Sequence, residues 1–471
     1  MKKGVNKKLD DFRKIHSAAV KSNDGKRCMI APHPDLKKEI KKELMIIQKE
    51  PKNRIFANKL KVQENSRPGF NDGLIYPGNT YPLGTSASAV QNARIMRAPL
   101  RGNVRVIVVL VDFSDKPMTK PKSYFENLFF STGVIATGSV KEYYKEVTNN
   151  LVDIQGQVVG PYRLPKTLSQ YAHGESGTGL ATPNARTMAK DAAVKSNPSV
   201  NFALYDNDHD NYVDAFVVVH AGKGAEVTGN PGDIWSHKWV LPAEYLADGS
   251  TKIYSYLTVP EDCNLGVCAH ELGHLLFLFP DLYDTDYSSE GIGDWCLMAG
   301  GSWNNGGLTP AHPSAWCKGN QGWVTVETPT SNRTGVIIKD VKTDKKVLKL
   351  WKNGVAGKEY FLLENRQKTK FDKNLPGDGL LIWHIDDNID GNSNEAHYQV
   401  ALMQSDGLRN LELGVNQGDD KDPYPGTLNK KTFNKTSAPN SKSYGGVDTL
   451  VSVTNIKKIG SDIKADIKVK P

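Results

Sequence analysis

The sequence has no run of 18 or more apolar residues, although hydrophobic residues make up 38% of its 471 positions. A transmembrane helix needs about 20 such residues, so we expect no membrane span. The first ten residues are basic but are not followed by an apolar segment, so no secretory signal peptide is visible. If the protein is exported, its signal peptide has been removed or export follows another route.

Cysteine is scarce, with five residues at positions 28, 263, 268, 296 and 317. If Cys263 pairs with Cys268 and Cys296 with Cys317, which is one of three possible connectivities, Cys28 is left unpaired. A lone thiol of this kind is either an incidental small buried hydrophobe or a group that binds a metal ion.

A basic surface for nucleic acid is also lacking outside the first residues. The net charge is +8, but residues 1–70 alone contain 19 Lys and Arg against 8 Asp and Glu, an excess of 11. The rest of the chain is therefore slightly acidic. The Lys-rich helical pattern over residues 35–48 is typical of a solvated helix face, so we expect no nucleic-acid partner. No sequence repeat and no nucleotide-binding glycine loop is present.

The most informative feature that the sequence does contain is the motif His270-Glu271-Leu272-Gly273-His274, which lies in a nearly continuous apolar stretch. On a helix, the two imidazoles lie one turn apart on one face and can both reach one Zn²⁺ at about 2.0–2.1 Å, with Glu271 placed to accept a proton from water. The alternative is a buried helix with two core histidines. Burying Glu271 without a partner would cost several kcal/mol, which favours the metal site.

Two histidines do not complete a zinc site, and the segment after the motif offers carboxylates. Pro280 is expected to end the helix and turn the chain, so the first carboxylate after it, Asp281, is the predicted third ligand. Asp284 is the alternative, and a Glu on a later helix stays open.

The motif, the carboxylates after it and the segment Gly291–Trp303 together resemble the immune inhibitor A family of secreted bacterial metallopeptidases, which are metzincin-like zinc endopeptidases. The resemblance implies protein or peptide substrates, Asp281 as the third ligand, and Met298 in a Met-turn beneath the histidines. This sequence departs from the metzincin pattern at two points. Phe277 occupies the place of a Gly, and six residues instead of five separate His274 from Asp281. The resemblance continues with lower specificity through the segments 105–112, 220–226, 233–238, 316–323, 359–366 and 376–386.

We therefore predict an α+β protein in which a metzincin-like zinc metallopeptidase domain is preceded by a pro-segment and followed by an antiparallel β-sandwich-like domain. The predicted boundaries are 1–100 for the pro-segment and linker, 101–325 for the catalytic domain and 326–471 for the C-terminal β-rich domain. Residues 67–88, rich in Gly, Pro and Ser, are the expected site of cleavage.

Local patterns predict the elements of these domains. Helices are expected at 124–130, 139–146 and 184–195, and strands at 105–110, 215–219, 335–339, 347–351, 360–364, 379–385, 400–403, 450–456 and 463–469. The alternating segment 252–259 is also a strand. It either borders the cleft, where a substrate could add as a further strand, or lies inside the sheet.

A second metal is predicted in the acidic loop at residues 206–214. Asp206, Asp208, Asp210 and Asp214 and the carbonyl of Tyr212 follow an EF-hand-like register that suits Ca²⁺. Asn211 stands where such loops prefer Gly, and no Glu follows at position 12. The alternative is a solvated turn. The later aspartates at 386, 387, 390, 419, 420 and 422 could hold a second Ca²⁺, but they have no regular ligand spacing, so we expect solvated turns there.

These observations predict a secreted zinc endopeptidase made as a latent zymogen, with Glu271 as general base and Cys28 as a candidate zinc-blocking thiolate. Tyr283, His237 and His312 are possible donors to the anionic intermediate, and the sequence does not choose among them. The rival is a cell-surface or mucin-binding module with a structural zinc. A structural site has no use for Glu271, which favours the enzyme. A third interpretation is a zinc hydrolase that acts on an amide other than a peptide bond. The sequence leaves the cleavage specificity and oligomeric state undetermined.

Overall fold

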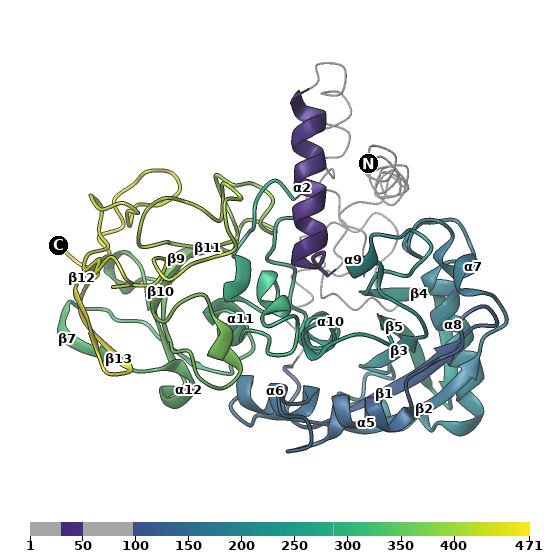
Figure 1. The fold of residues 1–471 in the computed structure, drawn as a ribbon. Coiled ribbons are helices and arrows are strands. Elements are labelled where there is room, and N and C mark those ends of the chain that lie inside the picture. The colour runs from purple at the N-terminus through teal and green to yellow at the C-terminus, as the bar shows by residue number, and fades with distance from the viewer. Residues whose placement is uncertain (1–29, 50–97, 286) are drawn as a thin grey trace. The chain divides into compact units, whose positions relative to one another are not determined.

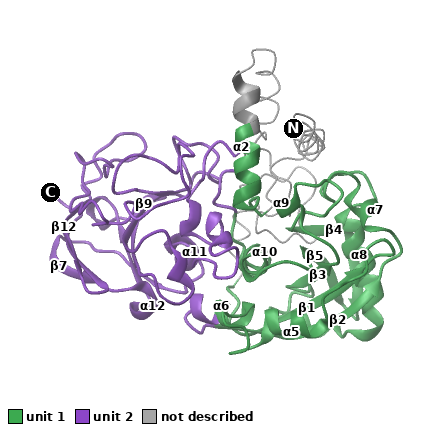
Figure 2. Ribbon diagram, in the orientation of Figure 1, with its two compact units in different colours: residues 1–144, 152–280 green, residues 145–151, 281–471 purple. Residues whose placement is uncertain are grey.

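The computed structural model describes residues 30–49, 98–285 and 287–471 (Figure 1). The chain divides into two compact units (Figure 2). Unit 1 consists of Met1–Tyr144 and Val152–Pro280, and unit 2 of Lys145–Leu151 and Asp281–Pro471. No helix in the described ranges is long and apolar enough to cross a membrane. The boundary between the two units, at Pro280 and Asp281, lies earlier in the chain than residue 325, the predicted end of the catalytic domain. The domain boundary at 325 was defined by the expected function and stays a prediction.

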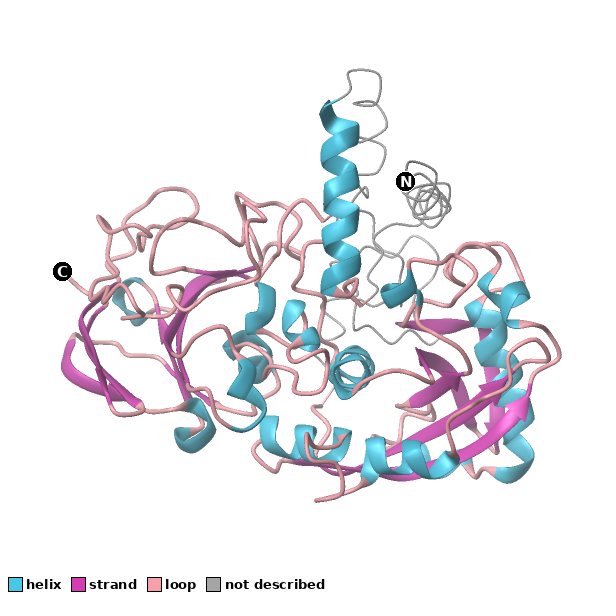
Figure 3. Ribbon diagram, in the orientation of Figure 1, coloured by secondary structure: helices cyan, strands magenta, loops and turns pink. Residues whose placement is uncertain are grey.

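Unit 1 is built on a five-stranded sheet in the order β2-β1-β3-β5-β4. Strands are drawn in magenta in Figure 3. The strands β1 (Gly102–Asp112), β2 (Val152–Arg163), β3 (Phe216–His220) and β5 (Thr251–Pro260) are parallel, and β4 (His237–Asp248) pairs antiparallel with β5. The central strands β1 and β3 are continuous apolar runs because a parallel sheet buries both faces. Each of residues 106–111 in β1 is accordingly fully buried.

The position of β5 decides between the two readings of segment 252–259. Since β5 lies between β3 and β4, it is an interior strand, and the reading in which it borders the cleft as a free edge is wrong. The edge strand on this side of the sheet is β4, which was not predicted from the sequence. Its first five residues are buried and its remainder is more exposed. An extended chain that joined this side of the sheet would have to pair with β4.

The helices of unit 1 include those predicted from the pattern. Their bounds are α2 (Pro34–Lys49), α5 (Lys122–Phe130), α6 (Val140–Val147), α7 (Leu168–Ala172), α8 (Ala185–Ser196), η2 (Asn197–Ser199), η3 (Phe202–Tyr205), α9 (Ala225–Thr228) and α10 (Leu265–Phe277). Helix α8 begins with a capping box in which Asn184 and Thr187 satisfy each other's backbone N–H groups. Its small residues, including Ala189 and Ala192, are fully buried, which lets the helix approach the sheet closely.

Unit 2 contains two sheets, and every strand predicted after residue 330 is present. The first sheet has the order β11-β10-β9-β8-β6 and the second β12-β13-β7. Their bounds are β6 (Thr325–Glu327), β7 (Arg333–Ile338), β8 (Lys346–Leu350), β9 (Glu359–Arg366), β10 (Gly379–Asp386), β11 (Val400–Leu402), β12 (Ser452–Ile459) and β13 (Asp462–Lys468). Pairing is antiparallel except between β6 and β8, which are parallel. Phe361 and Ile382 of the first sheet and Val453 and Ile463 of the second belong to one buried apolar cluster, so the two sheets share a core.

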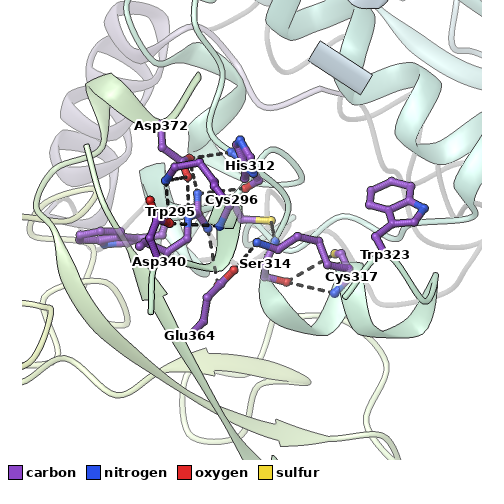
Figure 4. A network of polar contacts seen from close by, with 12 residues as sticks. Trp295, Cys296, His312, Ser314, Cys317, Trp323, Asp340, Glu364 and Asp372 are labelled. Carbon is purple, nitrogen blue, oxygen red and sulfur yellow. Dashed lines mark hydrogen bonds and ion pairs between the residues drawn. The ribbon is translucent and has the colours of Figure 1, made fainter. Parts of the chain in front are cut away.

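Short helices and loops complete unit 2. They are η4 (Gly293–Trp295), η5 (Gly300–Trp303), α11 (Ala315–Asn320), α12 (Val341–Asp344), η6 (Lys352–Gly354) and η7 (Lys370–Asn374). A buried polar network joins this region to β9 (Figure 4). Arg366 Nε donates to Asp372 Oδ2 at 2.8 Å, and Asp372 Oδ1 accepts from the backbone N–H of His312 at 2.9 Å.

A second ion pair in the same network joins Lys318 to Glu364, which also accepts from Trp383 Nε1 at 3.1 Å. All three side chains are buried. Charges in such an interior are stabilising only when paired and hydrogen-bonded, as they are here. The network therefore fixes residues 295–318, the stretch that includes Met298, against β9.

Candidate metal centre

Helix α10 carries the H-E-x-x-H motif, and all 13 of its residues are buried. The helix ends at Phe277, not at Pro280 as predicted. Leu278 adopts the left-handed conformation, with φ of 58°, and its N–H donates to His274 O at 3.2 Å, while Phe279 N–H donates to Gly273 O at 3.2 Å. These bonds satisfy carbonyls that the helix end would leave without partners. The chain has therefore already turned when it reaches the proline.

The two histidines of the motif point at a common position. His270 Nε2 and His274 Nε2 lie 3.0 Å apart, and both residues are fully buried. His274 Nδ1 lies 2.5 Å from the carbonyl oxygen of Phe279, so Nδ1 is the protonated donor and Nε2 carries the lone pair. A metal-binding imidazole in a protein is commonly oriented in this way, by a hydrogen bond from the ring nitrogen that does not bind the metal. The left-handed exit of α10 thus places the carbonyl that sets the tautomer of His274.

Asp281 completes this group of side chains. Its residue is 3% exposed, and ligand atoms of His270, His274 and Asp281 all lie within 4.8 Å of one another. Two imidazole nitrogens and one carboxylate oxygen are a donor set of catalytic zinc sites, which keep the fourth position open. The separation of the two nitrogens is less than twice the Zn–N distance of about 2.0–2.1 Å, so both reach one ion. The residues present fit zinc.

Asp284, the alternative ligand, is engaged elsewhere. Its Oδ2 accepts from Ser288 Oγ at 2.9 Å and from both the N–H and the Oγ of Ser289 at 2.7 Å. The residue is fully buried in this turn. The geometry therefore favours Asp281 over Asp284 as the carboxylate that faces the two histidines.

Glu271 is fully buried beside the two histidines on α10. Helix α6 contacts α10 at the residue directly before the motif, where the hydroxyl of Tyr144 donates to the carbonyl of Ala269 at 2.5 Å. The ring of Tyr144 also packs on Phe277, with ring centroids 5.0 Å apart. Burial and the nearby Glu271 carboxylate hold the pKa of Tyr144 well above its usual value, so this phenol stays a donor. These contacts hold the motif helix against α6.

Met298 is fully buried within unit 2. Its carbonyl accepts a hydrogen bond from the N–H of Leu282 at 2.7 Å, and its own N–H lies 3.4 Å from Cys296 Sγ. The loop of Met298 is therefore tied directly to the residue that follows Asp281. This is consistent with the predicted Met-turn, which stays a prediction.

In the acidic loop the structure gathers three of the four predicted carboxylates. Asp206, Asp208 and Asp210 have ligand atoms within 4.8 Å of one another. Asn211, in the place of the preferred Gly, adopts the left-handed conformation with φ of 69°. Asp214 is directed to another partner, since its Oδ2 accepts from the N–H of Asn207 at 2.5 Å and from its side-chain amide at 3.0 Å.

The four described cysteines form no disulfide bond and lie in two neighbouring pairs. Cys263 Sγ and Cys268 Sγ lie 3.4 Å apart, and Cys296 is hydrogen-bonded to Cys317. The pairing considered from the sequence thus matches the neighbours in space, without a covalent bond. Cys28 and the expected cleavage stretch 67–88 lie outside the described residues.

The three possible donors to an anionic intermediate each have partners. His237 is held between Trp235 O at 2.7 Å and the hydroxyl of Tyr256 at 2.9 Å. His312 Nε2 lies 2.7 Å from Glu146 Oε1. Tyr283 stacks on another tyrosine with ring centroids 6.4 Å apart. None of the three is assigned this role.

One feature that the sequence did not predict is the contact, within unit 1, between residues 30–36 of the predicted pro-segment and residues 226–235. The carbonyl of Ile30 accepts from Trp235 Nε1 at 2.9 Å, and the N–H of His33 donates to Glu226 O at 2.8 Å. Leu36 contacts the chain at Gly229, where an added Cβ would lie 3.0 Å from its Cδ1. These contacts involve main-chain groups, the indole of Trp235 and the apolar side chain of Leu36, so no charge or motif pattern could have revealed them.

Comparisons with known proteins identify a similar family and similar relatives. Residues 97–328 match the family described as immune inhibitor A peptidase M6, catalytic domain. The chain is 30% identical over 268 residues to a pre-pro-metalloprotease PrtV of Vibrio cholerae, covering 45% of this chain and 29% of that protein. It is 30% identical over 282 residues to immune inhibitor A of Bacillus thuringiensis subsp. alesti, covering 46% of this chain and 41% of that protein. The chain thus spans less than half the length of these relatives.

Proposed function

Residues 97–328 carry a peptidase M6 domain of the immune inhibitor A type, and from this premise we propose that the chain is a secreted zinc-dependent endopeptidase made as a latent zymogen. The observation that carries the proposal is the buried group of His270, His274 and Asp281 with Glu271 beside it. Protein or peptide chains are the proposed substrates. We also propose that the two sheets of unit 2 form a β-sandwich-like domain, supported by their shared apolar core.

His270, His274 and Asp281 would hold the zinc, which when bound lowers the pKa of water toward 7 and polarises a carbonyl. The Phe279 carbonyl keeps His274 in the tautomer that presents Nε2. Glu271 takes a proton from the attacking water and then delivers it to the leaving amine. The buried surroundings of Glu271 exclude bulk water, which strengthens its interactions with the reacting groups.

Two alternatives differ from this proposal in their use of Glu271. A binding module with a structural zinc would have four protein ligands, whereas only three described side chains converge in this group. A zinc hydrolase of another amide would use the same four residues. The similarity to metalloproteases in two organisms favours peptide bonds over other amides.

The test of the proposed function is incubation of leader-cleaved, zinc-loaded protein with a denatured protein mixture, followed by mass spectrometry of the new termini. We expect new internal termini that are absent when the metal is removed with a chelator. Binding of proteins without cleavage would support the binding module. Amide hydrolysis restricted to non-peptide substrates would support the third reading.

We further propose that the loop around Asp206, Asp208 and Asp210 binds structural calcium, with the Tyr212 carbonyl as a further ligand and Asp214 holding the loop through Asn207. Ca²⁺ prefers six to eight oxygen ligands, which carboxylates, a carbonyl and water can supply. The left-handed conformation of Asn211 provides the sharp turn that Gly provides in related loops.

Calcium at this loop is expected to raise the melting temperature of the parent chain. Binding to the folded state alone adds about 2.7 kcal/mol at a hundredfold excess over Kd. In Asp208→Ala the shift should be smaller, while Asn230→Ala, an exposed loop change in the same unit, should keep it. Thermal melts with and without millimolar Ca²⁺ measure this. An equal shift in the parent and Asp208→Ala would show that the loop binds no calcium.

Latency is proposed to come from the leader, residues 1–100. The contacts of Ile30, His33 and Leu36 with residues 226–235 support it, because they attach the leader to the part of the chain that contains the motif helix. Cys28, two residues before this anchor, is the candidate thiolate ligand of zinc. A bound sulfur at about 2.3 Å would exclude the catalytic water.

The leader proposal predicts earlier self-processing in Cys28→Ser and in Leu36→Ser. The first change removes the thiolate and the second weakens the anchor, whereas Lys42→Ser, at an exposed position of α2, should process like the parent. Time courses of precursor cleavage measure latency, and X-ray absorption on the intact precursor reports whether sulfur binds zinc. Absence of sulfur together with full latency of Cys28→Ser would leave the thiol without a role, and unchanged latency of Leu36→Ser would contradict the anchor.

A further inference from the structure

Three aspartates of unit 2 form a second group of carboxylates, separate from both sites described above. Asp406 follows β11, and Asp419 and Asp422 lie further along the same long connection to β12. One ligand atom from each lies within 4.8 Å of the others. The sequence includes Asp419 and Asp422 among the aspartates that could hold a second Ca²⁺, although it favours solvated turns there, and it does not single out Asp406. The fold brings the two stretches together.

The carboxylate of Asp422 is the most buried of the three, with 1% of its residue exposed. Its Oδ2 accepts from Trp295 Nε1 at 3.0 Å and from the N–H of Asp419 at 3.0 Å. Its other oxygen, Oδ1, is buried and receives no hydrogen bond from any part of the chain that the structure describes. A buried carboxylate oxygen without a partner is costly, so this atom requires a positively charged or donating group.

Asp406 presents the same arrangement. Its Oδ1 accepts from the N–H of Leu408 at 2.9 Å, while its Oδ2 is buried and lacks a donor among the described residues. Asp419 is oriented through both oxygens, by the N–H of Lys421 at 2.8 Å and the side-chain amide of Asn416 at 2.9 Å. Each carboxylate is therefore held in place by one or more hydrogen bonds, and two of the three keep a buried oxygen available.

The charge of the group is not compensated by basic side chains. Within residues 98–285 and 287–471, no ion pair involves Asp406, Asp419 or Asp422. Like charges at this spacing repel each other, and a cation relieves both the repulsion and the cost of burial.

The backbone is shaped to form this group. Gly418 has φ of +117°, and a Cβ at this position would lie 2.5 Å from Trp295 Nε1. Only glycine therefore allows the loop to approach the indole that holds Asp422. Tyr424, two residues later, exchanges backbone hydrogen bonds of 2.8 Å with Leu380 of β10. The turn is thus fixed at one end by the indole and at the other by the sheet.

We propose that Asp406, Asp419 and Asp422 bind a calcium ion that fastens the connection between β11 and β12 to the sheet of unit 2. The donors are oxygens only, which selects a hard cation over zinc. Calcium accepts irregular sets of six to eight oxygens at about 2.3–2.6 Å, a range that the 4.8 Å limit between ligand atoms accommodates, whereas magnesium demands near-ideal octahedral geometry. Backbone carbonyls and water complete the shell.

The experiment is a count of bound calcium on the full chain. Protein stripped with a calcium chelator is dialysed against radioactive Ca²⁺, and bound ion per chain is compared between the parent, Asp406→Asn and Asp422→Asn. Both changes keep the shape of the side chain and the existing hydrogen-bond acceptors but remove one ligand charge. Asp420→Asn is the matched control, since Asp420 is an exposed neighbour in the same turn and is not in the group.

We expect each of Asp406→Asn and Asp422→Asn to lose one bound calcium per chain at the Ca²⁺ concentration that saturates the parent, and Asp420→Asn to lose none. The variant Asp208→Ala separates this ion from the one proposed at the loop of unit 1, because a chain with both changes should lose both ions. Circular dichroism confirms that the variants are folded. Unchanged stoichiometry in folded Asp406→Asn and Asp422→Asn would overturn the proposal. The readout is metal binding, so it is independent of peptidase activity.

Discussion

Replacement of Glu271 by Gln is expected to lower peptide hydrolysis by about 10²- to 10⁴-fold while zinc stays bound, the usual effect of losing a general base. The amide has nearly the shape of the carboxylate but cannot accept the proton of the attacking water. His270, His274 and Asp281, which would hold the metal, are unchanged. The measurement is the initial rate of hydrolysis of a denatured protein by leader-cleaved enzyme, with zinc content determined on the same sample.

The matched control for this prediction is Glu226→Gln. Glu226 is also buried in unit 1, at 1% exposure, and burial raises its pKa to about 7, so an amide resembles its protonated form. We expect this control to keep the parental rate. A zinc-loaded Glu271→Gln enzyme with full activity would rule out Glu271 as the base. Equal losses in both variants would point to a general effect of changing buried carboxylates.

The second large effect is expected from Asp281→Ala, which should lose zinc on dialysis under conditions in which the parent retains it. Mutating a residue that merely supports a ligand costs about 10–100-fold in metal affinity, and loss of a ligand should cost more. Asp284→Ala is the natural comparison. It leaves Ser289 without its acceptor, which lowers stability by about 1–3 kcal/mol, but it should keep the metal.

Zinc per folded chain after dialysis, together with the melting temperature, separates these two outcomes. If Asp284→Ala loses zinc and Asp281→Ala keeps it, the ligand assignment is wrong. Loss of zinc in both variants, with both chains folded, would mean that the turn from Asp281 to Ser289 acts as one unit in metal binding.

The part of the site that is local in sequence could be predicted because a helix fixes the relation between residues four apart. His270, Glu271 and His274 needed only that geometry. The choice between Asp281 and Asp284 needed the course of the chain after α10. That course depends on the left-handed Leu278, which no sequence rule favours, because leucine rarely adopts this conformation. The predicted role of Pro280 as the helix terminator was wrong for the same reason.

The strands of unit 2 could also be predicted individually, because turn residues and short apolar runs mark each one. Their pairing could not. The parallel contact of β6 with β8 and the interior position of β5 in unit 1 depend on which strands meet after folding, since an apolar segment reads the same at an edge and in the interior. For the same reason, the position of β4 at an edge of the unit 1 sheet could not be predicted.

Sequence alone therefore determined the helix with the H-E-x-x-H motif and most of the other helices and strands, because each depends on residues that lie close together in the chain. Only the tertiary structure joined Asp406 to Asp419 and Asp422, brought Arg366 to Asp372 and His312, and set Ile30 against Trp235. These contacts connect residues far apart in the chain or depend on main-chain groups that every residue possesses. Their energies come from burial and hydrogen bonding that exist only once the core has formed.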